Sequence, residues 1–228
     1  MDGLLLIDKL AGLTSHDVVD AVRRIAKTRR VGHAGTLDPF ATGLLILGIN
    51  QGTKALTALV GLDKEYEATL ELGATSETFD PEGVITQHAT RNTQQPTAEE
   101  IERVLEQFRG GYDQKAPLHS AKKIKGKKLY ELARAGEATE EMRPSKHVSI
   151  PLLCVTSYVF PELRLRIACS SGTYIRSLAD DIGRALGTGA YCRQLRRTRI
   201  GDFSVHNATV LADLDLPKLT ASLLPIQR

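Results

Sequence analysis

The sequence lacks the features that mark several large classes of proteins. Its 228 residues include no tryptophan and only three cysteines, Cys154, Cys169 and Cys192, which are far apart in the chain. They fit neither a disulfide framework nor a C-x-x-C metal site. The six histidines form no H-E-x-x-H motif. We therefore expect neither a zinc site nor a set of structural disulfides.

Long hydrophobic runs are also missing. No stretch approaches the roughly 20 apolar residues that span a bilayer. The N-terminus, MDGLLLIDKL, has no basic start and only four successive apolar residues, so it does not read as a signal peptide. Apolar residues make up 42% of the chain and charged residues 25%, which are ordinary globular proportions. We expect a cytoplasmic protein that does not bind membranes.

The usual phosphate-binding motifs of nucleotide cofactors fail as well. Gly43 and Gly48 have the glycine spacing of a P-loop, but Ile49 and Asn50 replace the lysine and hydroxyl residues that contact phosphate and magnesium. No G-x-G-x-x-G follows a predicted strand. The sequence therefore gives no support for a nucleotide cofactor.

Positive charge is clustered although the total is small. Thirty Lys and Arg stand against 27 Asp and Glu, a net charge of +3. Basic residues gather at 23–30, 115–128 and 193–199, whereas acidic residues collect elsewhere. Segregated basic clusters are typical of proteins that bind a polyanion such as RNA. The alternative is that each cluster is an ordinary solvated face.

The hydrophobic pattern predicts a mixed fold. Apolar runs or alternating residues predict strands at 3–8, 44–49, 65–72 and 163–169. Capping boxes at Thr14 and Thr97 predict that helices begin there, and a third helix is predicted over 173–186 with Gly187 as its C-cap. Because strands and helices alternate without a regular βαβ rhythm, we expect an α+β fold with a mixed or antiparallel sheet.

Residues 115–146 differ from the rest of the chain. The segment is rich in lysine and glycine and contains a short helical piece over 127–135 that ends at Gly136. It fits an excursion from the core that orders on a partner, and it fits equally a surface loop with one helix.

The stretch 29–43 holds the strongest candidate for chemistry. Asp38 precedes Pro39, which favours an extended backbone at the aspartate. Three nearby glycines, Gly32, Gly35 and Gly43, would let another chain approach closely. An ionised carboxylate with an open approach can act as a nucleophile or a base. The alternative is a turn residue, since Asp and Pro are common in turns.

A second candidate is the start of the helix at 170–176. The free N–H groups there, with Arg176, could hold an anion, either a phosphate or the carboxylate of Asp38. Tyr66 and Tyr174 lie at the ends of predicted elements, where an aromatic ring could stack on a base. Core packing is the alternative for both tyrosines.

The segment 32–43, GHAGTLDPFATG, closely resembles the signature of the TruB family, the tRNA pseudouridine-55 synthases. The resemblance continues over nearly the whole chain, in the order expected for the family. It includes GLLLIDK at 3–9, GLTSHD at 12–17, DKEY at 63–66, TFD at 78–80, APLHSA at 116–121, GKKLYELAR at 126–134, CSSGTYIR at 169–176 and LRR at 195–197.

The resemblance implies a cofactor-free isomerase that flips a uridine of the tRNA T arm into a pocket and converts it to pseudouridine. Asp38 resembles the family's catalytic aspartate, Tyr66 the ring that stacks on the base and helps remove the C5 proton, and Arg176 the partner of Asp38. Attack by Asp38 on C1′, attack on C6 and removal of a 2′ proton all remain open. The further substrate contacts that it implies are His33, Asp80, Tyr174 and Leu195.

The expected organisation is a single catalytic domain over 1–228 with a thumb-like insertion at about 115–146 and no complete PUA domain. We expect a monomer that needs no protein partner, with Lys122, Lys123, Arg196 and Arg197 on the RNA backbone. His119 stands where the family often has tyrosine, which puts an RNA contact there in doubt. Either this member lacks the PUA domain or the chain was cut before it, and in both cases we expect weaker tRNA binding and intact chemistry.

Two other functions compete with this interpretation. One is a related synthase that depends on a guide RNA, which the thumb-like segment disfavours. The other is a tRNA-binding or tRNA-folding factor whose isomerase activity is incidental or lost. Asp38, Tyr66 and Arg176 are all present, which favours an active enzyme.

Overall fold

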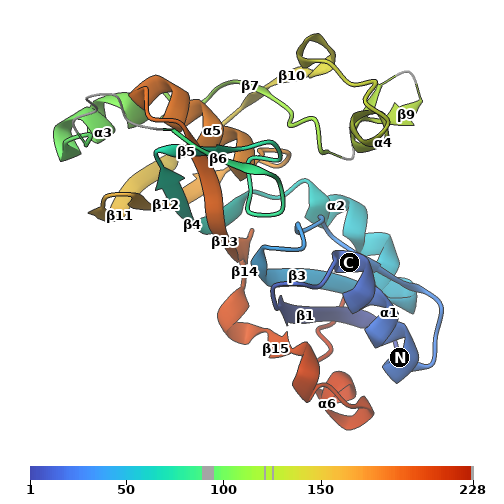
Figure 1. Ribbon diagram of the computed structural model, residues 1–228. Coiled ribbons are helices and arrows are strands. Elements are labelled where there is room, and N and C mark those ends of the chain that lie inside the picture. The colour runs from blue at the N-terminus through green and yellow to red at the C-terminus, as the bar shows by residue number, and fades with distance from the viewer. Residues whose placement is uncertain (89–94, 121, 125, 227–228) are drawn as a thin grey trace. The chain divides into compact units, whose positions relative to one another are not determined.

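The computed structural model describes residues 1–88, 95–120, 122–124 and 126–226, which form two compact units (Figure 1). Unit 1 comprises residues 1–67 and 195–228, and unit 2 comprises residues 68–194. Two strands, β4 (Lys64–Leu72) and β13 (Ala190–Ile200), run through the boundaries between the units. Among the described residues, no helix has both the length and the apolar character needed to cross a membrane.

Unit 1 is built on a pair of apolar strands. Strand β1 (Gly3–Lys9) pairs antiparallel with β3 (Thr42–Ile49), with Leu5 opposite Leu47. The strand order continues from β13 through β3 and β1 to β15. The remaining elements are β2 (Val31–His33), β14 (Phe203–Ser204), β15 (Thr209–Val210), α1 (Ser15–Ala26), α2 (Leu56–Val60), α6 (Leu216–Ala221) and the 3₁₀ helices η1 (Asn50–Ala55), η3 (Val205–Asn207) and η4 (Leu211–Asp213).

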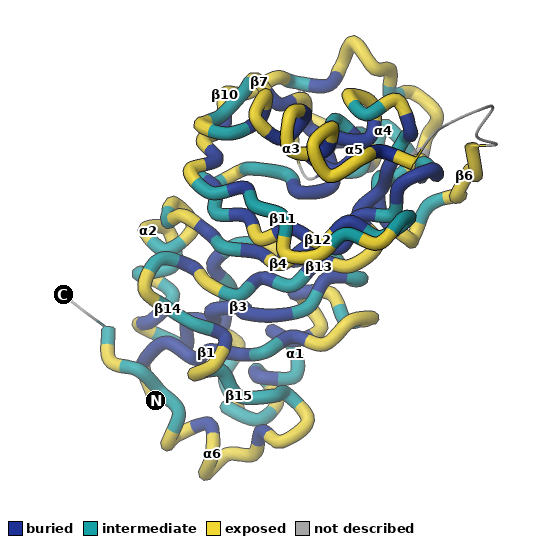
Figure 2. The backbone as a smooth tube through the Cα atoms, turned by 90° about the vertical axis from the view of Figure 1, so that its left-hand side faces the viewer, coloured by how far each residue is buried: buried dark blue, intermediate teal, exposed yellow. Residues whose placement is uncertain are grey.

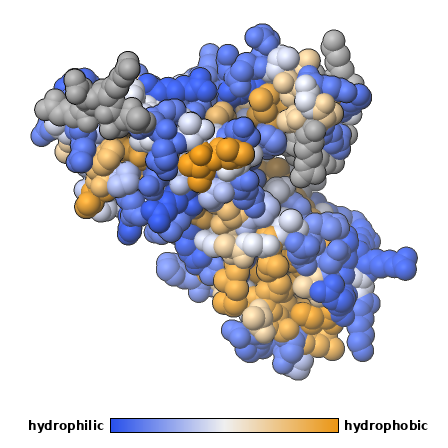
Figure 3. All heavy atoms as spheres, viewed as in Figure 1, coloured by the Kyte–Doolittle hydropathy of each residue, from blue (hydrophilic) through white to orange (hydrophobic). Residues whose placement is uncertain are grey.

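Both faces of β1 and β3 are covered, which explains why these strands are apolar without alternation. Leu5 and Leu47 pack against Val18 and Val22 of α1, while residues on the other face, such as Leu6, pack with β3 and the 3₁₀ segment at 205–207. Both strands are almost entirely buried (Figure 2). On the face of unit 1 shown in Figure 3, hydrophobic residues gather in the region of these strands.

Unit 2 contains an antiparallel hairpin of two long strands, β11 (Leu152–Val159) and β12 (Glu162–Cys169), and the order continues through β4 to β13. Leu163, Leu165 and Ile167 of β12 are buried, and the intervening residues are more exposed. The other elements are β5 (Ala74–Ser76), β6 (Ile85–Gln87), β7 (Tyr112–Lys115), β8 (Lys123–Ile124), β9 (Lys127–Lys128), β10 (Ser145–Val148), α3 (Ala98–Leu105), α4 (Leu129–Arg134), α5 (Ile175–Leu186) and the 3₁₀ helix η2 (Glu140–Met142).

The lysine-rich segment lies within unit 2 and begins and ends at one strand pair. Strands β7 and β10 are antiparallel, and Lys115 lies opposite Ser145. The hairpin β8–β9, α4 and η2 all lie between these two strands in the chain. The two ends of the segment are therefore held together at its base.

The predicted elements agree well with the structure. Capping boxes are formed at Thr14 and Thr97, and Gly187 ends α5 in the left-handed conformation with φ 73°. Parallel pairs (β1–β15 and β3–β13) occur beside antiparallel ones, so the prediction of an α+β fold with a mixed sheet is confirmed. Strands were predicted only at β1, β3, β4 and β12; the other strands, among them the long β11 and β13, were not predicted.

The cap of α3 gives a test of local stability. Thr97 Oγ1 accepts a hydrogen bond from the Glu100 N–H (3.2 Å), and Glu100 accepts one from the Thr97 N–H (2.8 Å). Thr97→Ala should lower the free energy of unfolding by about 1 kcal/mol because the hydroxyl of the cap is lost. Urea unfolding measures this, and Thr97→Ser, which keeps the hydroxyl, is the control. Equal losses in both variants would contradict the capping role.

Candidate functional site

The loop that carries Asp38 is fixed from both sides within unit 1. Ser15 Oγ accepts a hydrogen bond from the Leu37 N–H (2.9 Å) and donates one to the Leu37 carbonyl (3.1 Å). The Ala41 N–H donates to the Asp38 carbonyl at 3.1 Å. Ser15 is buried at the start of α1, and Asp38 is half-buried. The backbone at Asp38 is therefore held by the helix that precedes it in the chain.

Lys9 holds the other side of the same loop. Its side chain is fully buried at the end of β1, and Nζ donates to the carbonyls of Leu10 (3.0 Å), Leu13 (2.7 Å) and Pro39 (3.2 Å). The Pro39 carbonyl also accepts from the Gly12 N–H at 2.9 Å. Charge-assisted bonds of this kind are the strong ones, so the ammonium fixes the residue that follows Asp38.

The structure corrects the expectation that Arg197 contacts RNA. Its side chain is 1% exposed, so it has almost no surface to offer a phosphate. The guanidinium donates to the carbonyls of Leu44 (2.8 Å), Thr36 (3.3 Å) and Gly35 (3.1 Å). A buried cation must be satisfied locally, and here it is satisfied by the Asp38 loop. Arg197 supports that loop from inside unit 1.

Gly43 allows β13, the strand that carries Arg197, to lie close against β3. It lies opposite Arg197 in the parallel pair of β3 and β13, with φ at 102°. A Cβ at this position would lie 2.2 Å from the Arg197 carbonyl oxygen, so any other residue would push the two strands apart. The sequence analysis predicted that Gly43 would let another chain approach closely. In the structure, the backbone that approaches it is β13 of the same chain.

Three further predicted residues also lie in unit 1. Tyr66 is buried in β4, and Leu195 is buried in β13, where its carbonyl accepts from Thr42 Oγ1 at 3.4 Å. His33 is half-buried in β2, and its Nδ1 has no hydrogen-bond partner among the described residues. Burial and the nearby Arg197 cation lower the pKa of His33 below its usual value of 6.5. His33 is therefore neutral at pH 7.

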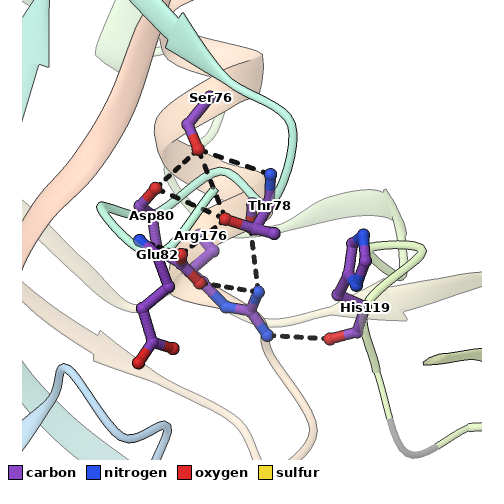
Figure 4. A network of polar contacts seen from close by, with 6 residues as sticks. All are labelled: Ser76, Thr78, Asp80, Glu82, His119 and Arg176. Atoms are coloured by element: carbon purple, nitrogen blue, oxygen red, sulfur yellow. Dashed lines mark hydrogen bonds and ion pairs between the residues drawn. The ribbon is translucent and has the colours of Figure 1, made fainter. Parts of the chain in front are cut away.

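In unit 2 the structure brings Asp80 and Arg176 together (Figure 4). Arg176 Nη1 lies 3.0 Å from Asp80 Oδ2, and both side chains are buried, with exposed fractions of 6% and 3%. Asp80 Oδ1 accepts from Thr78 Oγ1 (2.5 Å) and from the Glu82 N–H (2.9 Å). Arg176 also donates to the carbonyls of Thr78 (2.9 Å) and His119 (3.1 Å).

The sequence analysis did not predict this ion pair between Asp80 and Arg176. Both carboxylate oxygens of Asp80 are engaged within unit 2, so the contact with Arg176 is the role that the geometry supports. Removing one member of a buried pair leaves an uncompensated charge, which costs about 3–5 kcal/mol. The predicted contact of Asp80 with the base and the predicted pairing of Arg176 with Asp38 both stay predictions.

The remaining predicted residues are placed as follows. Tyr174 is half-buried and is the N-cap residue of α5. Lys122 is exposed, and the side chain of Lys123 lies outside the described part of the structure. Arg196 makes a two-point ion pair with Asp8 (3.0 and 2.7 Å), and its side chain is 37% exposed. Contacts of Lys122, Lys123 and Arg196 with RNA stay predictions.

Metal ligands do not gather in the described residues. No group of three or more His, Cys, Asp or Glu residues is arranged there to hold an ion. The chemistry that this part of the chain can offer comes from a carboxylate on a fixed loop, an arginine–aspartate pair and tyrosine rings.

Solved structures share this fold. A chain in the crystal structure of a Cbf5–Nop10–Gar1 complex superimposes with a TM-score of 0.72 at 30% sequence identity, over 93% of this chain and 53% of that one. A chain in the structure of an H/ACA RNP bound to a substrate RNA gives 0.69 at 27% identity, over 93% and 52%. The present chain thus spans about half the length of these solved chains. The fold is that of a pseudouridine synthase, as expected.

The family follows from the sequence comparisons. Residues 23–175 match the family model described as TruB family pseudouridylate synthase (N terminal domain), and residues 176–223 match tRNA pseudouridylate synthase B C-terminal domain. The chain belongs to the TruB family, which confirms the resemblance found in the motifs.

Relatives in two bacteria are similar over most of their length. A protein of Leifsonia xyli subsp. xyli is 47% identical over 218 residues, 93% of this chain and 72% of the relative. One of Mycobacterium tuberculosis (strain ATCC 25618 / H37Rv) is 46% identical over 224 residues, 97% of this chain and 74% of the relative. Both are named tRNA pseudouridine synthase B.

Sequence reasoning missed the residues that hold the Asp38 loop. Lys9 and Ser15 belong to the N-terminal motifs, but nothing in their local pattern indicates that they contact residues 37–39. Arg197 was counted with a basic cluster, because a buried arginine looks the same in a sequence as an exposed one. A signal was present for Lys9: it ends an apolar strand, and a lysine in such a strand needs polar partners.

Arg197→Lys should destabilise unit 1 and the Asp38 loop. Lysine cannot reproduce the fork that reaches Gly35, Thr36 and Leu44, so we expect a loss of roughly 2 kcal/mol in the free energy of unfolding. Arg199→Lys, at an exposed position two residues along the same strand, is the matched control and should change stability little. Chemical denaturation of both variants measures the difference. Similar stability of the two variants would show that the guanidinium does not support the loop.

The lowered pKa of His33 predicts a pH dependence with a definite sign. The unfolded chain binds a proton at this residue near pH 6.5, whereas the folded chain binds it only at lower pH. Stability should therefore fall as pH drops below about 6.5, and be unaffected by this group at higher pH. Between pH 7.5 and 5.5, the free energy of unfolding should fall less for His33→Asn than for the wild type. The difference between the two should be about 1 kcal/mol or less. An NMR titration that places the His33 ring at or above 6.5 would contradict this.

Proposed function

We propose that this chain is an enzyme that isomerises a uridine of tRNA to pseudouridine. The observation that carries the proposal is the agreement, over more than nine-tenths of the chain, with relatives named tRNA pseudouridine synthase B. The fixed loop around Asp38 and the buried pair of Asp80 and Arg176 add a physical reason: each holds a charged group in place without substrate. Preorganised charge of this kind favours catalysis over simple binding.

The finer proposal concerns the target and the reaction. The target uridine lies at position 55 in the T arm, and its base must leave the stack to be reached. The C1′–N1 bond breaks, the base turns while bound, C5 bonds to C1′, the C5 proton is lost and N1 gains a proton. Asp38 starts this sequence by attack on C1′, by attack on C6 or by removing the 2′ proton. The atoms of substrate and product balance without an oxidant, so we propose that no cofactor takes part.

The other residues receive their roles from the same proposal. Tyr66 stacks on the flipped base and helps remove the C5 proton, and His33, Tyr174 and Leu195 complete the pocket. Arg176 pairs with Asp38, and Asp80 orients Arg176 through their ion pair within unit 2. Neutral His33 suits a contact with an uncharged base, because an imidazole without charge loses less hydration on burial.

The partner of the chain is tRNA, held by phosphate contacts that include Lys122, Lys123 and Arg196. We propose that the chain acts as a monomer in the cytoplasm without a protein partner or a guide RNA. The excursion between β7 and β10, with its exposed lysine at 122, provides the surface for the RNA arm. Phosphate contacts of this kind would make binding dependent on salt.

The test is release of tritium from an unmodified tRNA transcript that carries tritium at uridine C5. Wild type should release it, and Asp38→Asn should reduce the rate by at least about 10⁴-fold, as expected for loss of a nucleophile or base. Asp202→Asn, an exposed aspartate of the same unit, is the matched control and should release tritium at the wild-type rate.

The outcomes separate the competing functions. Equal release by wild type and Asp38→Asn would remove Asp38 from its role. Tight tRNA binding by the wild type with no release would favour a tRNA-folding factor. Release that appears only when a guide RNA is added would favour the guide-dependent class.

A further inference from the structure

Gln114 is a buried amide that forms two hydrogen bonds with the residue at the start of α5. The residue lies in β7, beside α5 (Figure 1), and only 2% of it is exposed. Its Oε1 accepts from the Tyr174 N–H at 2.8 Å, and its Nε2 donates to the Tyr174 carbonyl at 3.0 Å. A single side chain thus engages both polar groups of one backbone residue.

A second contact fixes which way the amide points. Gln114 Nε2 also donates to the Tyr112 hydroxyl at 2.7 Å, and that hydroxyl donates to Asp181 Oδ2 at 2.8 Å. Because the Tyr112 proton is used for the carboxylate, its oxygen is left to accept, and only the NH₂ end of Gln114 can supply the proton. Burial and the nearby carboxylate of Asp181 raise the pKa of Tyr112, which keeps the hydroxyl protonated.

The position of this clamp matters because α5 has no side-chain cap of its own. Helices α1 and α3 begin with threonine caps, whereas Tyr174, the N-cap residue of α5, makes no such bond. The first N–H groups of a helix need external partners. Gln114 supplies one at Tyr174, two residues before Arg176.

We propose that Gln114 is a positioning residue for the isomerisation, which sets the backbone of Tyr174 and, through the first turn of α5, the guanidinium of Arg176. Tyr112 and Asp181 hold the amide in the orientation that this requires. The inference rests on the proposed function, since it assigns Tyr174 and Arg176 to the substrate pocket. It adds a residue of β7, from the base of the lysine-rich excursion, to the control of the reacting groups.

The test compares three variants of this network with a control. Gln114→Met keeps the length of the side chain and removes both hydrogen bonds to Tyr174 as well as the one to the Tyr112 hydroxyl. Gln114→Glu keeps the acceptor but, when ionised, cannot donate to the Tyr174 carbonyl. Tyr112→Phe keeps the ring, which packs edge-on against Phe108 at 5.0 Å, and removes the hydroxyl. The matched control is Tyr158→Phe, since this hydroxyl also bonds within unit 2, to the Pro96 carbonyl at 2.7 Å.

The first measurement does not depend on activity. Amide hydrogen exchange at Tyr174 should speed up by at least about tenfold in Gln114→Met and stay at the wild-type rate in Tyr158→Phe. Wild-type exchange at Tyr174 in the methionine variant would overturn the clamp, whether or not the chain is an active enzyme.

The second measurement is tritium release at saturating and limiting tRNA. Gln114→Met should lower kcat on the order of 10- to 100-fold with a small change in KM, because the reacting groups are misplaced while the RNA surface is intact. Tyr112→Phe should lower kcat less, and Tyr158→Phe should not change it. If wild type releases tritium and Gln114→Met keeps its kcat, the positioning role is overturned. If wild type releases none, the proposed function has failed instead, and exchange at Tyr174 alone decides on the clamp.

A third measurement separates positioning from a loss of folding. In Gln114→Glu the introduced carboxyl is buried, so its pKa should be raised, and in its protonated form it can donate to the Tyr174 carbonyl as the amide does. The ratio of its kcat to that of wild type should therefore rise as pH falls from 8 to 5.5. Asp180 and Asp181, whose pKa values are raised by burial, also titrate beside this site, and the Gln114→Met variant, which adds no carboxyl group, shows their contribution. The ratio for Gln114→Met should stay flat, and a flat ratio for Gln114→Glu as well would overturn the hydrogen-bonding role.

Discussion

The need to satisfy buried charge governs how the functional residues of this chain are held. Arg176 and Arg197 each lie almost out of contact with solvent, one in each unit. Arg176 contacts Asp80 and two carbonyl groups, and Arg197 contacts two carbonyl groups of the Asp38 loop and one of strand β3. A cation removed from water has a large desolvation cost unless its donors are used. The backbone that supplies the acceptors is therefore confined to one arrangement.

The two arginines use this constraint in different ways. Arg197 is surrounded by neutral carbonyl groups, so its effect is to shape a loop. Arg176 has a full negative charge beside it, and that charge is itself held by Thr78 and by the Glu82 N–H. An ion pair buried in this way is weak evidence for high stability, because desolvation offsets much of the attraction. Its value lies in a fixed direction for the guanidinium, which a mobile surface arginine would not have.

Much of the fold could be predicted from the sequence, because periodicity and capping act locally. The boxes at Thr14 and Thr97, and the glycine stop at 187, depend on residues three or four positions apart. Strand β13 was missed because its arginines at 193, 196, 197 and 199 suggest a solvated face, and only tertiary contacts bury one of them. Family motifs found the candidate residues. The local pattern at Lys9 indicates a need for polar partners, but not which ones. The contacts of Lys9, Ser15 and Gln114 could not be predicted, because they reach across 22 to 60 residues of chain.

Lys9, at the end of β1, also couples the local unfolding of two segments. Its ammonium group donates to carbonyl oxygens of the turn after β1 and of Pro39, the residue after Asp38. The ammonium group can reach water only when its hydrogen bonds to both segments break. Local unfolding of the turn at 10–13 and of the loop at 37–39 should then occur as a single event rather than independently. Asp38 lies in this cooperative segment. Its backbone should therefore leave the folded position only rarely, although its loop contains no regular secondary structure.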